Sequence, residues 1–438
     1  MEPRPLQVDF GEALRVWLKI GCIGFGGPAG QIALMHRILV DEKKWVEESR
    51  YLHALNFCML LPGPEAQKLA TYVGWLLHGM RGGLAAGILF VLPGALVMLA
   101  VSLVYVLGRG VPVIDGALYG IKAAVLVIVV EALIRIGRRA LKTRLLVGLA
   151  GAAYVGIFFL DLSFPLIVAA AAFVGYFAPP ALLGLKPGEH PVIPAAPGRW
   201  RHAATVSVVG LMLWWAPVAL AVLLLGAGHV LADIGLFFSK LAVVSFGGAY
   251  ALLSYMAQEA VETYRWMTAP EMVDGLGLAE TLPGPLIKVT QFVGFLGAYR
   301  AAEPFSPVVA GVIGSALTTW VTFLPPMLLI FAGAPFIEQL RANHRLSGAL
   351  AAITAAVVGV ILNLTIWFVL HVLFAQIEEM RAGPLRWYAF DPGSIDLRAA
   401  ALALVAAALA FRFHRGLVEL VAIMAALGIA VRFLLGTN

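Results

Sequence analysis

The sequence predicts an all-α polytopic membrane protein with about 13 transmembrane segments, and three observations lead to this fold class. Of the 438 residues, 61% are hydrophobic and only 13% are charged, whereas soluble domains carry about 25% charged residues. The apolar runs are continuous over stretches such as residues 84–107 and 203–228, and they are rich in Ala, Leu and Val. The strands of a membrane barrel would instead alternate apolar and polar residues, so helices are the expected spanning elements.

The composition also excludes several classes of protein. A soluble enzyme, a disordered chain and a collagenous chain are incompatible with a mean hydropathy of +0.91. The net charge of +6 comes from cations between the apolar runs, where they set membrane orientation, so nucleic acid is not an expected partner.

Cys22 and Cys58 lie inside apolar stretches, which argues against a disulfide framework or a zinc site. No small-residue cleavage site follows a short apolar core near residue 1, so we expect no removable signal peptide.

The sequence contains an internal duplication. Four features of the first half recur 221 residues later without a gap: Lys19 as Lys240, Gly24-Phe25-Gly26-Gly27 as Ser245-Phe246-Gly247-Gly248, Trp45 as Trp266, and Leu61-Pro62-Gly63-Pro64 as Leu282-Pro283-Gly284-Pro285. Leu/Ala-rich sequences match by chance, but an ungapped run that includes Lys, Trp and Pro-Gly-Pro does not do so easily. We therefore predict a first repeat in residues 1–178, a cytoplasmic linker and an unpaired transmembrane helix in 179–228, and a second repeat in 229–438.

Positive charges between the apolar runs predict the topology. The segment Arg135–Arg144 contains five cations and no acid, so it is expected in the cytoplasm. Residues 203–228 form one extra span without a repeat partner, which seats the second half in the opposite orientation. The halves are then inverted repeats, with the N-terminus inside and the loop of residues 376–396 outside. Whether residues 10–79 cross twice or form re-entrant hairpins is left open, because residues 40–50 mix charges of both signs.

The repeated motifs resemble those of the chromate ion transporter family. Phe25-Gly26-Gly27-Pro28, Trp45 and Leu61-Pro62-Gly63-Pro64, each with its second copy, are similar to the pattern of the long, two-domain chromate-efflux proteins. The resemblance covers both halves of the chain. It implies a multi-pass protein of the bacterial inner (plasma) membrane, an antiporter that exports chromate from the cytoplasm with coupling to protons and so gives chromate resistance. One departure is Ala249, which stands where the first copy has Pro28 and leaves the second Phe-Gly-Gly element less constrained.

The two Pro-Gly-Pro motifs interrupt long apolar segments. Proline breaks a helix but suits the first turn of the next one, so Pro62-Gly63-Pro64 and Pro283-Gly284-Pro285 are each expected to end one half-helix and begin another. The new N-terminus offers N–H groups that suit an anion. The glycines of Phe25-Gly26-Gly27 and Phe246-Gly247-Gly248 would bring further backbone N–H groups close to an oxyanion. The alternatives are simple kinking for the prolines and helix packing for the glycines.

Four lysines are candidate ligands for a dianion, because a lysine at membrane depth is costly and a tetrahedral oxyanion needs cations to replace its hydration. Lys19 and Lys240 precede the Phe-Gly-Gly elements, and Lys68 and Lys288 follow the Pro-Gly-Pro motifs. The alternative is that their long side chains reach the membrane interface.

Carboxylates are the natural carriers of a coupled proton, since burial favours their neutral form. Glu65, directly after the first Pro-Gly-Pro motif, and Glu280, shortly before the second, are the best-placed candidates. Both could instead form structural pairs with the neighbouring lysines. Lys122 lies in another apolar run and is replaced by Thr354 in the second repeat, so any role of Lys122 is confined to one half.

The sequence lacks the motifs that other functions would require. The chain has no phosphate-binding GxxxxGK[ST], no HExxH, no GxSxG and no Cys/His cluster, so we expect a non-enzyme without cofactor or metal. Its expected partners are chromate or a related oxyanion and the lipid bilayer. The alternatives left open are a transporter of sulfate or another small oxyanion, and an anion channel. The sequence does not fix the oligomeric state, and a homodimer is compatible with it.

Overall fold

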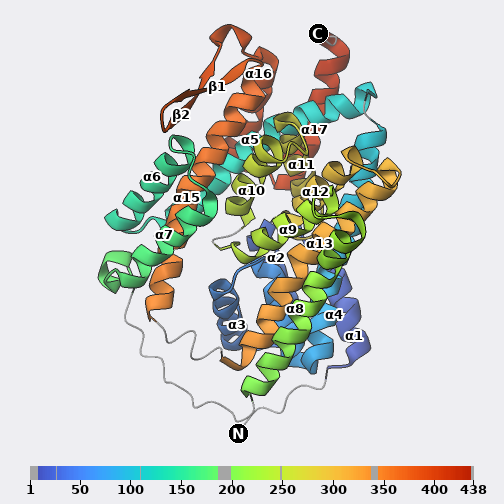
Figure 1. The fold of residues 1–438 in the computed structure, drawn as a ribbon, viewed down its shortest axis with the longest axis vertical. Coiled ribbons are helices and arrows are strands. Elements are labelled where there is room, and N and C mark those ends of the chain that lie inside the picture. The colour runs from blue at the N-terminus through green and yellow to red at the C-terminus, as the bar shows by residue number, and fades with distance from the viewer. Residues whose placement is uncertain are drawn as a thin grey trace. The chain divides into compact units, whose positions relative to one another are not determined.

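The computed structural model describes residues 8–25, 27–108, 110–185, 199–246, 249–336 and 344–435, and these residues are predominantly helical (Figure 1). The chain divides into two compact units. The first unit comprises Met1–Ala100, His190–Ser245 and Leu282–Ala342, and the second comprises Val101–Glu189, Phe246–Thr281 and Asn343–Asn438. Each unit therefore draws segments from both halves of the sequence.

The first unit is built from helices and short helical turns. These are α1 (Phe10–Ile23), α2 (Gly27–His36), η1 (Arg37–Glu42), α3 (Glu48–Leu60), most of α4 (Glu65–Leu107), α8 (Arg199–Leu225), α9 (Val230–Val243), η4 (Leu286–Lys288), α12 (Val289–Arg300), α13 (Pro307–Gly333) and η5 (Ala334–Phe336). The 43 residues of α4 contain a kink, because His78 and Gly79 have non-helical dihedral angles, with φ of 60° at Gly79.

The second unit adds a small hairpin to its helices. Its elements are α5 (Pro112–Ala140), α6 (Arg144–Phe158), α7 (Phe164–Phe177), η2 (Pro180–Leu183), α10 (Ala249–Gln258), η3 (Glu259–Thr263), α11 (Ala269–Thr281), α15 (His344–Leu373), β1 (Ile377–Ala382), β2 (Leu385–Phe390), η6 (Pro392–Ser394), α16 (Leu397–Ala407), η7 (Ala408–Arg412) and α17 (Leu417–Leu435).

Local sequence signals explain where these helices begin. The side chain of Asp9 accepts a hydrogen bond from the Glu12 N–H at the start of α1, and the Thr143 hydroxyl does the same for Leu146 in α6. The helices α5, α7 and α13 carry proline in their first turn, where no N–H partner is required.

The two long helices of the second unit pack across the repeat boundary. The first-half helix α5 packs against α16 and α17, and the second-half helix α15 packs against α6 and α7 (Figure 1). The α5–α17 contact is close, because a Cβ added at Gly120 would lie 1.8 Å from the carbonyl oxygen of Met424. Small residues commonly allow such approach between membrane helices.

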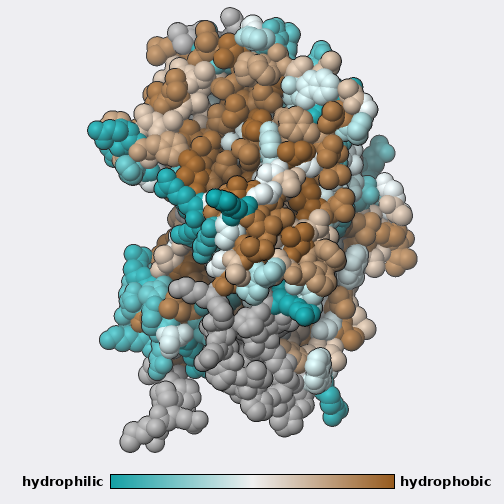
Figure 2. Space-filling view, turned by 90° about the vertical axis from the view of Figure 1, so that its left-hand side faces the viewer, coloured by the Kyte–Doolittle hydropathy of each residue, from teal (hydrophilic) through white to brown (hydrophobic). Residues whose placement is uncertain are grey.

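Within the described residues, six helices are long and apolar enough to cross a membrane. They are Glu65–Leu107, Pro112–Ala140, Trp200–Leu225, Pro307–Gly333, Arg345–Leu373 and Leu417–Leu434, with α6 and α7 as shorter apolar helices. The helical, multi-pass character is confirmed, whereas the count of about 13 spans is not. Large apolar side chains are exposed, such as Leu223 at 80% on α8, and Figure 2 shows hydrophobic residues over much of one face. Such a surface suits contact with lipid.

Equivalent positions of the two halves fold alike around the Pro-Gly-Pro motifs. The helices α3 and α11 begin and end at positions that are 221 residues apart. Lys44 and Arg265, at the same displacement, have φ of 54° and 53° in the loops that precede these helices. The duplicated sequence therefore specifies the same local backbone twice.

The hairpin β1–β2 occupies the segment that the sequence analysis treated as a loop, residues 376–396. Its strands pair in antiparallel fashion from Ile377 opposite Phe390 to Ala382 opposite Leu385. The two-residue turn places Gly383 at φ 60°, a conformation that glycine adopts without strain. The prediction of a purely helical chain is thus corrected at this one place in the described residues.

Candidate functional site

The Pro-Gly-Pro motifs form sharp corners between helices, as the sequence predicts. The first corner lies between the end of α3 at Leu60 and the start of α4 at Glu65, with Gly63 at φ 103°. The second follows the end of α11 at Thr281, with Gly284 at φ 94°. Side chains other than hydrogen are disfavoured at such dihedral angles, so glycine is required at both corners.

Each corner packs tightly against a helix from the other half of the sequence. A Cβ at Gly63 would lie 2.4 Å from Cγ of Pro326 on α13. A Cβ at Gly94 on α4 would lie 2.4 Å from the carbonyl oxygen of Pro283. Both contacts lie within the first unit, and they leave space for hydrogen alone.

Two reciprocal hydrogen bonds connect the corner of each half with the backbone of the other half. The N–H of Gly63 donates to the carbonyl oxygen of Ser245, and the N–H of Gly284 donates to the carbonyl oxygen of Gly24, each over 2.9 Å. These four residues, here called the crossover, are related in pairs by the displacement of 221 residues. Gly24 directly precedes Phe25, so the backbone beside the first Phe-Gly-Gly element meets the second Pro-Gly-Pro motif.

Lys68 and Lys288 lie at the corners and are each only 1% exposed. The Lys68 ammonium donates to the carbonyl oxygen of Leu61. The Lys288 ammonium donates to the carbonyl oxygens of Leu282 and Gly284, at 2.9 and 3.2 Å. A cation is favourable beside carbonyl oxygens that no longer have a helical partner, so each lysine stabilises the backbone of its own corner. The two lysines therefore place one buried ammonium group at each corner.

The other lysine and carboxylate candidates occupy different environments. Lys19 on α1 and Lys240 on α9 have exposed side chains. Glu65 is half-buried at the first residue of α4 in the first unit, and Glu280 is 6% exposed near the end of α11 in the second unit. The structure therefore buries Lys68 and Lys288, but not Lys19 and Lys240.

The Phe-Gly-Gly candidates are described only in part. Phe25 is 38% exposed, and Gly27 begins α2 with φ of 67°. Phe246 is half-buried in the second unit. Gly26, Gly247 and Gly248 lie outside the described residues.

Buried amide side chains near the corners were missed by the sequence analysis. Gln31 Nε2 donates to the Gly24 carbonyl over 3.1 Å, and Gln67 Nε2 donates to a carbonyl of α13 over 2.9 Å. Their Oε1 atoms, and the hydroxyl of the fully buried Thr71, have no hydrogen-bond partner among the described residues. Buried polar atoms normally have partners, so this region can satisfy further polar groups. Polar residues inside apolar helices were the available signal.

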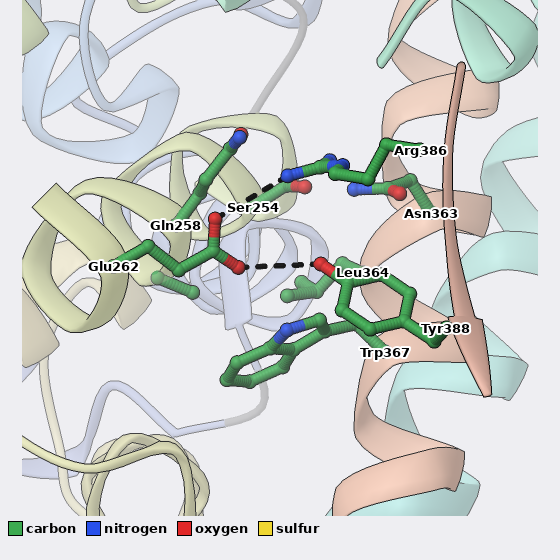
Figure 3. A pocket seen from close by; sticks show the side chains of 9 residues that line it. Ser254, Gln258, Glu262, Asn363, Leu364, Trp367, Arg386 and Tyr388 are labelled. Atoms are coloured by element: carbon green, nitrogen blue, oxygen red, sulfur yellow. Dashed lines mark hydrogen bonds and ion pairs between the residues drawn. The ribbon is translucent and has the colours of Figure 1, made fainter. Parts of the chain in front are cut away.

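A second polar cluster lies in the second unit, where Arg386 of β2 points toward α10 and η3 (Figure 3). Its Nη1 lies 2.9 Å from Asp161 Oδ1 and 3.4 Å from Glu262 Oε2, and its Nη2 donates to the carbonyl of Ile157 over 2.9 Å. Burial raises the pKa of the Glu262 carboxyl, and burial likewise raises the pKa of Tyr388, which donates to Glu262. The cavity beside them has a volume of about 10 Å³, room for a single water molecule. This cluster fastens the hairpin and offers little space for an anion.

No group of three His, Cys, Asp or Glu side chains that could hold a metal ion occurs in the part of the chain that the structure describes. The chemistry available at the crossover is that of ammonium groups, backbone N–H groups and neutral amides. Such groups bind anions by charge and hydrogen bonding.

Comparisons with known proteins agree with this chemistry. Residues 11–176 and 232–431 match the family described as Chromate transporter. The chromate transport protein of Pseudomonas aeruginosa is 32% identical over 369 residues, which cover 82% of this chain and 81% of that protein. The probable chromate transport protein of Synechococcus elongatus is 28% identical over 351 residues, covering 80% and 82%. The chromate transport protein of Cupriavidus metallidurans is 27% identical over 353 residues, covering 80% of each. No solved structure gives a significant match.

Proposed function

Because this chain belongs to the chromate transporter family, we propose that it is a secondary active transporter that exports chromate from the cytoplasm in exchange for protons. Three relatives are named as chromate transport proteins, one of them as a probable one, and each matches at least 80% of this chain. The absence of a nucleotide-binding motif from the sequence favours an ion gradient over ATP as the energy source. The location that this function implies is the inner membrane of a bacterium.

The observation that carries the proposal is that each corner holds a buried lysine. Chromate is a tetrahedral dianion, and it must exchange its hydration for cations and N–H donors when it enters a protein. Lys68 and Lys288 supply two positive charges at the corners, and each is 1% exposed, so their field is little screened by water. The N-terminal N–H groups of α4 and the backbone of Phe25, Gly26 and Gly27 are proposed to complete the binding site.

We further propose that the two halves are inverted repeats that alternate in opening the site to each side of the membrane. Each corner would then belong to one half of a gate, and the shared hydrogen bonds of the crossover would link the two movements. Glu65 and Glu280, which flank the two corners in sequence, are proposed to lie on the path by which the coupled proton enters and leaves.

The experiment is uptake of labelled chromate into proteoliposomes that hold the purified protein and an acidic interior. We expect accumulation by the wild type, and strong loss with Lys68→Ala and with Lys288→Ala, because each removes one charge of the site. The matched control is Lys142→Ala, which removes an exposed lysine of the loop before α6 and should leave uptake unchanged. Excess unlabelled sulfate tests the substrate: full competition would assign the site to sulfate or to oxyanions in general. Wild-type uptake by both lysine variants would contradict the proposed site.

A further inference from the structure

A buried aspartate in the second unit has an unusual set of neighbours. Asp274, in the middle of α11, is 4% exposed. Its Oδ2 accepts a hydrogen bond from the Tyr105 hydroxyl over 2.9 Å, and its Oδ1 lies 3.3 Å from the ammonium nitrogen of Lys122 on α5. Oδ1 has no hydrogen-bond partner among the described residues. The carboxylate is thus held by one ion pair and one hydroxyl, and it retains the capacity to bind a proton.

The close crossing of α5 and α11 brings these groups together. A Cβ at Gly277 would lie 2.2 Å from Cγ2 of Ile121, so the backbone of α11 packs directly against side chains of α5. Gly277 lies one turn after Asp274, and Ile121 directly precedes Lys122. The same contact that packs the helices therefore sets the distance between the aspartate and the lysine.

The charge of this pair changes when one proton binds. A buried carboxylate is tolerated when a cation compensates it, and a buried ammonium that loses its partner becomes costly. Protonation of Asp274 would convert the ion pair into a neutral acid beside an uncompensated Lys122, whose side chain is 25% exposed. The relative stability of different α5–α11 arrangements would then depend on whether the proton is bound.

We infer that Asp274 takes up and releases the coupling proton of the transport cycle, with Lys122 as its counter-ion and Tyr105 as its positioning partner. This inference rests on the proposed proton-coupled export. Proton uptake converts the carboxylate to the acid and proton release restores the ion pair, so no other reactant is involved. The pair joins the two halves, and because the repeat-related positions are His53 and Thr354, the chain contains it once.

The charged groups around Asp274 support a single titrating centre. Those that act on it electrostatically are Lys122 and, on its own helix, Glu271, which accepts from the N–H of Thr268 over 2.8 Å. Most other charged residues of the helices packed against α11 have different partners, and Arg138 and Arg139 are exposed in the last turn of α5. On α5, Asp115 pairs with Arg432 of α17 and Glu131 with Arg135; on α17, Glu419 pairs with Arg415; on α15, Arg345 stacks on Tyr176, and His371 bonds to the carbonyl of Trp367.

The test separates proton coupling from substrate transport in proteoliposomes. In the first assay, an interior two pH units more acidic than the bath drives labelled chromate uptake, with the membrane potential clamped at zero by potassium and valinomycin. One coupled proton then sustains an accumulation of about 100-fold. In the second assay, labelled chromate exchanges with unlabelled chromate at equal pH, which requires no net proton movement.

Asp274→Asn should abolish the accumulation in the first assay and retain exchange in the second. The double variant Asp274→Asn/Lys122→Met removes the unpaired ammonium as well, so it should fold and give the same result if the single variant is unstable. Asp274→Glu, which keeps a titratable group, should retain some accumulation. Glu131→Gln is the matched control, because it removes a carboxylate of α5 that pairs only with the nearby Arg135 in the described structure, and it should behave as wild type.

The outcomes distinguish the inference from the proposed function. Absence of chromate exchange in the wild type would overturn the transport function itself. Gradient-driven accumulation by Asp274→Asn or by the folded double variant would overturn the role of Asp274 while leaving transport intact. Loss of exchange by the folded double variant would also overturn it, since Asp274 would then act in substrate transport and not in coupling.

Discussion

Replacement of Gly63 by alanine tests the geometry of the first corner. At φ 103°, a residue with a side chain is strained by about 1–3 kcal/mol. The added Cβ would also lie 2.4 Å from Cγ of Pro326, whose ring cannot rotate away. Overpacking of this kind costs about 1–3 kcal/mol. The two effects together predict destabilisation by about 2–6 kcal/mol, along with weaker hydrogen bonding to Ser245.

Two other glycines of the same chain serve as matched controls. Gly383 in the hairpin turn has φ of 60°, but a Cβ there would meet nothing within 4 Å, so Gly383→Ala should cost only about 1–2 kcal/mol. Gly148 lies inside α6 with equally open space, so Gly148→Ala should stabilise the helix by about 0.5–1 kcal/mol.

The measurement is thermal unfolding of the three purified variants in one detergent, followed by tryptophan fluorescence, with chromate uptake in parallel. The expected order of melting temperatures is Gly148→Ala highest, then Gly383→Ala, then Gly63→Ala. If Gly63→Ala melts with or above Gly383→Ala and transports normally, the tight corner described here is wrong.

Three further predictions concern the second unit. Gly120→Ala forces a methyl group toward the Met424 carbonyl and should separate α5 from α17, which would lower the melting temperature more than Gly148→Ala raises it. Arg386→Met removes the buried partner of Asp161 and Glu262, whose side chains are 31% and 29% exposed, and should destabilise the fold by about 1–3 kcal/mol, which limited proteolysis of the hairpin can report. Burial raises the pKa of Glu262, so the folded state binds this proton more tightly than the unfolded state. Stability should therefore fall as pH rises from the ordinary glutamate value through the raised one, and Glu262→Gln should flatten that slope in melting curves.

The sequence predicts the helical membrane class and the corner motifs because both depend on local chemistry. Apolar runs specify spanning helices, and a Pro-Gly-Pro motif breaks a helix in whatever surroundings it occurs. The exposed position of Lys19 could also be predicted from the sequence. Ala13, Val16 and Ile20 form the apolar face of α1 that is buried, and Lys19 lies outside this face.

The features that the sequence does not predict depend on contacts between distant segments of the chain. The pairing of Asp274 with Lys122 follows from the crossing of α5 and α11, and neither residue carries a motif of its own. Arg386 belongs to a short hairpin whose strands are largely exposed, so no apolar alternation marked it. The crossover required knowing that the carbonyls of Gly24 and Ser245 face the opposite corner, which a repeat alignment does not reveal.

The reciprocal hydrogen bonds at Gly63 and Gly284 mean that neither copy of the duplicated segment is complete by itself. A polypeptide with one copy would present a corner amide without its acceptor and a carbonyl without its donor. A second such polypeptide could supply both, in the same arrangement that the fused chain contains. Covalent fusion therefore fixes the stoichiometry of an assembly that two separate halves could form. It also frees each half to change independently, as Lys122 of the first half and Asp274 of the second illustrate, since neither is repeated in the other half.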